Sequence, residues 1–400
     1  MSNNTVDPDG DVILNLEYPN DPFAPECGSP PTRTQRPNST ALTENDSSLK
    51  TLSSTQDIAE PGEGDKTVKF RVSSRHLVLA SPVFKSALTG GWKESAKIEG
   101  KHQINSQGWD TTAFGIFLNA IHCQYRQVPR VLELEMLAKV AVIVDYYAAH
   151  QAMEILSSIW ITELRWRLLT TTTCHNRTIA LWICISWVFG DSVAFESATK
   201  VAIHHGRLRM TDFGLPIPKR VIGKNSLILY HVGLTKAAND FTLTEDINSR
   251  RRRHLVIVFS ELSVLQQDLL DSRKGCGVEC RTMQLGALTR LLNSTSLLKF
   301  SLGEDYQALS VGEILKEVEV AVCPTWYGKP EVKIDTFKPH NRQVISKPHE
   351  CPTPGNAFNL AMKSIVNLPQ VSDGVNDFSR GLSITGYVKS STELEQCVPQ

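Results

Sequence analysis

The residues with the greatest potential for chemistry are three cysteines and a histidine in the C-terminal half. Three residues separate Cys276 from Cys280, and Gly277 between them would let the chain turn so that both thiolates reach one cation. His349 and Cys351 add two ligands of suitable softness. Together the four predict a Cys3His zinc site that clamps the C-terminal segment onto the preceding helices. Its role would be structural, because four protein ligands leave no open position.

An alternative is that these residues are ordinary thiols in a packed region. The C-x3-C spacing is less common than C-x2-C in zinc sites, and about seventy residues separate the two halves of the predicted site. The sequence also lacks the short motifs of dinucleotide and phosphate loops, nucleophile elbows and zinc proteases. We therefore expect no catalytic residues and a non-enzymatic protein, with structural zinc as the one cofactor to test.

The elements that position residues are clearest after residue 66. Residues 67 to 72 alternate apolar and polar side chains, which predicts a strand with one buried face. Leu77 and Phe84 then follow at helical spacing, in two short helices. Ser81 can cap the second helix, and Pro82 suits its first turn because proline has no amide hydrogen to lose there.

Two longer apolar faces follow at helical spacing. The first begins after Asp110, which is well placed to cap it, and consists of Phe114, Phe117, Leu118 and Ile121. The second consists of Leu134, Leu137, Val140, Val144 and Tyr147. The order of strand, helix pair and longer helices predicts an α+β unit.

These elements resemble the BTB/POZ domain. DPDGDVILNLEY at residues 7 to 18 is similar to its opening strand, with Asp11 at the place of an acidic residue that commonly begins it. Asp145 and Tyr147 resemble the Asp-x-Tyr signature of a later helix. The chain is most similar to fungal BTB proteins with a helical C-terminal half, which share stretches like SWVFGD at 186 to 191.

The resemblance implies a BTB/POZ fold, a helix cluster with a small flanking sheet, over residues 7 to 165. A mainly α-helical region at 166 to 365 and a mobile tail at 366 to 400 would follow. Residues 22 to 66 interrupt the domain with a polar stretch that buries too little apolar surface to order, so we expect a disordered insertion. The strands on either side can still pair, because the cost of closing a loop grows only logarithmically with its length.

A BTB domain presents surfaces to other proteins, so the resemblance implies a protein-protein interaction scaffold that self-associates as a homodimer. The dimer face in this family combines the N-terminal strand and the first helix. Its candidates here are Asp11, Val12, Leu14, Leu77 and Leu79. The insertion lies near this face and leaves dimerisation open.

A second function that the resemblance implies is that of an adaptor for a cullin-based ubiquitin ligase. Trp92, Lys93 and Glu94 occupy the place of the apolar-x-Glu motif through which adaptors similar to the speckle-type POZ protein bind cullins. Trp92 would be the anchor and Glu94 its polar complement. The alternative is a surface turn whose tryptophan packs on its own domain.

A third hypothesis is a nuclear scaffold associated with transcription or chromatin. It requires that the basic run Arg250 to Arg253 acts as a nuclear import signal. A solvated helical face is the preferred interpretation, because the run precedes the apolar stripe of a long helix expected to start near Thr244. The chain has 42 basic and 42 acidic residues, so we expect neither nucleic acid nor a membrane as a partner.

Scattered cysteines and a polar N-terminus predict an intracellular protein, in the cytoplasm, the nucleus or both. The apolar run at 178 to 189 is too short to cross a bilayer and predicts a buried helix. The last fifty residues have weak periodicity, and we expect them to fray.

Overall fold

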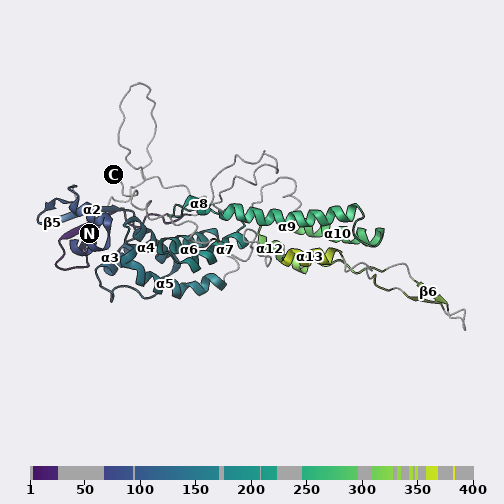
Figure 1. Ribbon diagram of the computed structural model, residues 1–400. Coiled ribbons are helices and arrows are strands. Elements are labelled where there is room, and N and C mark those ends of the chain that lie inside the picture. The colour runs from purple at the N-terminus through teal and green to yellow at the C-terminus, as the bar shows by residue number, and fades with distance from the viewer. Residues whose placement is uncertain are drawn as a thin grey trace, which may run out of the picture. The chain divides into compact units, whose positions relative to one another are not determined.

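The chain is mixed α+β, as predicted (Figure 1). It divides into two compact units. Residues 1–129 and 146–153 form the first unit, and residues 130–145 and 154–400 form the second. The computed structural model describes residues 3–25, 67–92, 95–170, 175–207, 209–222, 246–295, 309–327, 331–334, 342–345, 347–349, 357–367 and 382.

Within its described residues, the first unit contains a five-stranded sheet in the order β1-β3-β2-β5-β4. The strands are β1 (Asn3–Thr5), β2 (Val12–Glu17), β3 (Thr67–Val72), β4 (Lys97–Ile98) and β5 (Lys101–Gln107). β2 pairs with β3 in antiparallel orientation, from Val12 opposite Val72 to Glu17 opposite Thr67. The predicted pairing of strands across the insertion is therefore confirmed, while residues 26–66 of that insertion lie outside the described part of the chain.

The described helices of the first unit are α1 (Ser74–Ala80), α2 (Pro82–Thr89) and α3 (Thr111–Ile121). The last two begin after the capping residues that the sequence predicts. Ser81 caps α2 by accepting a 3.1 Å hydrogen bond from the Phe84 N–H, and its own hydroxyl donates to the Tyr147 carbonyl. Asp110 caps α3 by accepting from the N–H groups at the start of the helix, at 3.0 Å. Both caps satisfy amides that an isolated helix would leave without partners.

An aromatic cluster around Tyr147 forms much of the core of the first unit. The Phe84 ring stacks on Tyr147 with ring centroids 4.3 Å apart, and Phe117 stacks on it at 5.7 Å. The Tyr147 hydroxyl shares a 2.7 Å hydrogen bond with the Ser106 hydroxyl. Burial raises the pKa of Tyr147 to about 12, so this side chain stays a neutral core residue at physiological pH.

The described part of the second unit is mainly helical. Its helices are α4 (Leu134–Tyr146), α5 (His150–Thr170), α6 (Asn176–Phe189), α7 (Ser192–His205), α8 (Lys219–Ile222), α9 (Ile247–Leu270), α10 (Val278–Ser294), α12 (Val311–Val320) and α13 (Ala357–Asn367). The ends of α4 and α5 nearest residue 148 belong to the first unit. A two-stranded ribbon of β6 (Glu331–Ile334) and β7 (Arg342–Ile345) adds to the helices.

The helix predicted to be buried at 178 to 189 is confirmed as α6, with Ile179 and Ile185 fully buried. Among the helices described, we find none with the length and hydropathy to cross a membrane. α9 packs against α10 (Figure 1), and its stripe of buried leucines begins at Leu255 and ends at Leu269. α9 begins one residue after Asp246, which caps it; Thr244 lies outside the described residues.

The arginine run in α9 corrects one prediction. Arg250 and Arg251 are 6% and 1% exposed, so a solvated face is wrong for these two residues. The Arg251 guanidinium donates hydrogen bonds to the carbonyls of Arg207 and, at 2.6 Å, of Leu309. Arg251 therefore connects α9 to two other segments: the chain that leaves α7 and the chain that enters α12.

The expectation of fraying over the last fifty residues is wrong for α13. Phe358, Met362 and Ile365 of this helix are buried in a core shared with α9, α10 and α12. Leu382, within the predicted tail, is also buried, and its N–H donates to the Thr199 hydroxyl at 2.8 Å. The remainder of the predicted tail beyond Asn367 lies outside the described residues.

Candidate partner surface and candidate metal centre

Trp92 lies in the turn that follows α2, and 60% of its surface is exposed. Gly91 before it has a φ of +75°, a conformation that glycine adopts without strain. The Trp92 carbonyl accepts hydrogen bonds from the Ser95 N–H at 3.0 Å and the Ser95 hydroxyl at 2.6 Å. The turn is therefore held by its own hydrogen bonds while the indole meets solvent. Lys93 and Glu94 lie outside the described residues.

Gly90 determines where the Trp92 indole lies. A Cβ at residue 90 would be 2.8 Å from indole Cδ1 and 2.9 Å from Nε1, and 2.4 Å from the Ser86 carbonyl oxygen. The indole therefore rests against the backbone at the end of α2, at a place that only glycine leaves open. The indole remains 60% exposed at this place, and the sequence pattern alone did not indicate the close approach to Gly90.

The five candidates for a dimer face are in different environments. Val12, Leu14 and Leu77 have no exposed surface, so the prediction that they line a face is corrected: they are core residues of the first unit. Leu79 is the opposite case, because 88% of its surface is exposed on α1. An apolar side chain this exposed gains much from being covered by a partner.

Asp11 supports the start of α1. Its carboxylate accepts hydrogen bonds from the Ser74 N–H and the Ser74 hydroxyl, both at 2.8 Å. Partial burial raises the pKa of Asp11, but these hydrogen bonds outweigh the effect and leave the pKa below its usual value. Asp11 therefore connects β2 to α1 as an ionised residue.

The structure brings together three of the four predicted zinc ligands. Cys276 Sγ lies 3.2 Å from His349 Nε2, and the ligand atoms of Cys276, Cys280 and His349 are all within 4.8 Å of one another. Cys280 is in the first turn of α10, Cys276 immediately precedes the Gly277 that caps this helix, and His349 comes from the distant C-terminal chain. Cys351 lies outside the described residues.

Two residues that the sequence did not single out hold these ligands. Gln284, fully buried one turn after Cys280, donates from Nε2 to Cys280 Sγ at 3.1 Å. The Trp326 ring stacks on His349 with centroids 4.2 Å apart, and the Trp326 carbonyl accepts the His349 N–H at 2.8 Å. No spacing in the sequence predicts either contact, because both depend on the tertiary packing of the unit.

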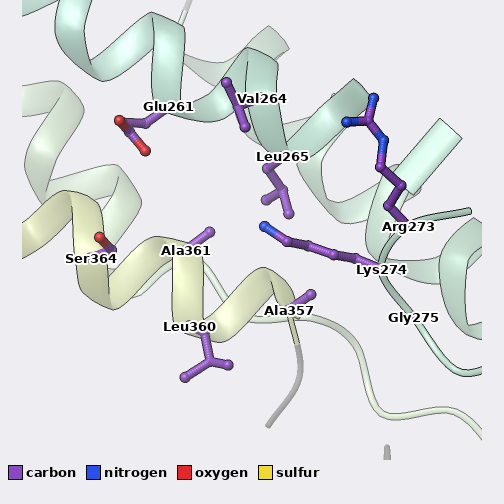
Figure 2. Close-up of a pocket in the computed structure, with 10 residues that line it drawn as sticks. All are labelled: Glu261, Val264, Leu265, Arg273, Lys274, Gly275, Ala357, Leu360, Ala361 and Ser364. Atoms are coloured by element: carbon purple, nitrogen blue, oxygen red, sulfur yellow. The ribbon is translucent and has the colours of Figure 1, made fainter. Parts of the chain in front are cut away.

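A pocket of about 450 Å³ lies between α9, the turn after it and α13, and Gly275, the residue before Cys276, is among the residues that line it. Figure 2 shows Lys274 extending from that turn toward Leu265 of α9 and Ala361 of α13. Lys274 pairs with Asp268 at 2.9 Å, and Arg273 pairs with Asp268 and Asp271. The cations at the pocket are thus already neutralised by acidic neighbours, and the pocket has little excess charge with which to attract an anion.

Comparisons of the chain with models of protein families, with curated proteins and with solved structures give no match.

Proposed function

We propose that the chain is a protein-interaction scaffold that acts by binding and not by catalysis, through a first unit of the BTB/POZ type. The observation that carries the proposal is the arrangement of that unit. An N-terminal strand pairs with a strand beyond the insertion, two short helices follow, and β5 then returns parallel to β2. A small sheet flanked by helices is the arrangement that the sequence resemblance implies.

The exposed apolar residues support a binding role for this unit. Leu79 on α1 and Trp92 after α2 are 88% and 60% exposed. Tryptophan is among the commonest anchors of protein interfaces, because a buried indole removes a large apolar area from water. The Trp92 carbonyl accepts hydrogen bonds from the Ser95 N–H and hydroxyl, and the indole is left 60% exposed, where a partner can cover it.

A cullin is the second candidate partner, and the exposure of Trp92 favours it specifically. An anchor for a cullin groove must project from the unit, and Trp92 does so at the place where the family motif would lie. The nuclear reading needs an accessible basic run, and the burial of Arg250 and Arg251 removes half of that run from the surface. We therefore rank the cullin adaptor above the nuclear scaffold.

Replacing Trp92 with alanine should weaken partner binding by about thirtyfold, which corresponds to the roughly 2 kcal/mol lost at a typical hot spot. The fold should change little, because the indole is mostly exposed. The measurement is quantitative affinity purification of the full chain with mass spectrometry, followed by titration of the recovered partner. Tyr125→Ala is a matched control, since Tyr125 is a 58% exposed aromatic residue of the same unit.

The proposal predicts partners that are retained by the wild type and Tyr125→Ala but lost by Trp92→Ala. A cullin among them would establish the adaptor. If Trp92→Ala retains every partner, the claim that Trp92 belongs to the binding surface is wrong. If the variant melts far below the wild type, Trp92 contributes to the fold and the surface assignment fails for that reason.

A further inference from the structure

We propose that Cys276, Cys280 and His349 bind one zinc ion, which joins the start of α10 to the chain segment at residues 347–349. The two parts are remote in sequence, and they meet at these three side chains. The proposal is independent of the scaffold function, because it concerns the second unit alone.

The geometry of the three ligand atoms suits zinc. Zn–S bonds of about 2.3 Å and Zn–N bonds of about 2.0 Å in a tetrahedron place a sulfur and a nitrogen about 3.6 Å apart. The Cys276 Sγ to His349 Nε2 distance of 3.2 Å is close to that value, and the limit of 4.8 Å for all three atoms requires only small side-chain movements. Two thiolates and an imidazole favour zinc over the harder magnesium and calcium ions.

Both cysteines lie at the start of one helix, so a single ion can reach both sulfur atoms. Cys280 is the third residue of α10, and Cys276 lies just before the helix. Their sulfur atoms are within 4.8 Å of each other and of the His349 ligand nitrogen. Gln284 adds a hydrogen-bond donor, because its Nε2 reaches Cys280 Sγ.

The orientation of Gln284 is fixed by a second hydrogen bond. Its Oε1 accepts the Phe358 N–H at 3.0 Å, so its amide nitrogen must be the group that faces Cys280. Gln284 is fully buried, and it connects the first turn of α13 to a proposed metal ligand. A buried amide that is held in place and directed at a ligand sulfur is typical of the outer shell of a metal site.

His349 is also held in position. Stacking on Trp326 restricts the plane of the imidazole ring. The backbone hydrogen bond between the same two residues also holds the segment of chain that contains His349. Zinc bound here would link three parts of the unit: the turn after α9, the His349 segment, and α13 through Gln284. Cys351, the fourth ligand predicted from sequence, follows His349 by two residues, and the proposal rests on the three described ligands.

The test is metal analysis of the full chain, purified without chelator and dialysed against zinc followed by metal-free buffer. We expect about one zinc per chain, and a roughly tenfold lower content in Cys276→Ser combined with Cys280→Ser and in His349→Ala. Cys123→Ser is the matched control, because Cys123 is an exposed cysteine of the first unit and should leave the zinc content unchanged. Replacing zinc by cobalt should give the visible absorption of a tetrahedral thiolate site.

A ligand variant that fails to fold would lose zinc for a trivial reason, so a variant outside the ligand set is needed. Gln284→Met keeps the bulk of the side chain and removes the amide, and we expect it to weaken zinc binding in a chelator competition by about tenfold or more. Leu288→Met, one turn further along α10 and equally buried, should leave the affinity unchanged. The proposal is overturned if wild-type protein holds no zinc, or if His349→Ala and the double cysteine variant still hold one zinc per chain.

Discussion

Replacing Phe117 with alanine should lower the free energy of unfolding of the first unit by about 3 to 5 kcal/mol. Phe117 has no exposed surface, and its ring stacks on Tyr147 and lies 6.3 Å from Phe114 between centroids. Alanine would leave a cavity in the centre of the aromatic cluster, where neighbours held by their own stacking cannot collapse easily. A loss of this size is a large fraction of the stability of a typical domain.

The measurement is calorimetry of the full chain, in which two units can give separate transitions. We expect the transition of the first unit to fall by about 10 °C or more in Phe117→Ala. Phe117→Leu, which keeps most of the volume, should cost much less. If the alanine variant melts within a degree or two of the wild type, the aromatic cluster does not stabilise the unit.

Replacing Arg251 with methionine should destabilise the second unit by about 2 to 5 kcal/mol. Methionine preserves much of the volume but leaves the carbonyls of Arg207 and Leu309 without the guanidinium that they now share. Both carbonyls belong to segments outside helices, one after α7 and one before α12. Without the guanidinium, these two segments would be held less firmly against α9. A buried acceptor without a partner is costly because it has also lost its hydrogen bond to water.

Arg252→Met is the matched control, because Arg252 is the next residue of the same helix and is exposed. Urea unfolding should separate the two variants, with the control within about 0.5 kcal/mol of the wild type. Equal stabilities of Arg251→Met and Arg252→Met would show that the buried guanidinium is not a structural link.

Local structure was predictable where the deciding interaction lies within a few residues. Ser81 and Asp110 cap helices by contacts to amides two or three positions away, so their type and place were sufficient. The pairing of β2 with β3 was also predictable, because two half-apolar strands need partners and the intervening polar stretch adds little to the cost of closure. The α+β class followed from these elements.

Predictions failed where contacts with residues distant in the sequence determine whether a side chain is buried. Four arginines in succession predict a solvated face, yet Arg251 is buried because two distant carbonyls converge on that turn of α9. The family resemblance assigned Val12, Leu14 and Leu77 to a partner face, but their side chains point into the core of the unit, which membership of a strand or helix does not reveal. α13 was missed although Phe358, Met362 and Ile365 lie at helical spacing, because the burial of this face depends on a core that other helices provide.

The two candidate sites show the same division. The types of Cys276, Cys280 and His349 were enough to propose them as ligands of one site, and the family resemblance was enough to propose Trp92 as an exposed anchor. The residues that orient them, Gln284 for the cysteine and Gly90 for the indole, act through contacts that no spacing encodes. The sequence can therefore suggest which residues are ligands or anchors, whereas the residues that orient them are found only in the structure.

We propose that the scaffold also self-associates, as the BTB/POZ resemblance implies, and this claim is tested most directly by the molar mass of the full chain in solution. Light scattering across a concentration series should give a mass approaching twice the 44.5 kDa of one chain. Leu79→Asp should return the mass to that of a single chain, because the 88% exposed leucine on α1 would place a charge in the interface, whereas Tyr125→Asp should not. A mass of one chain at every concentration, or a dimer unaffected by Leu79→Asp, would contradict the account.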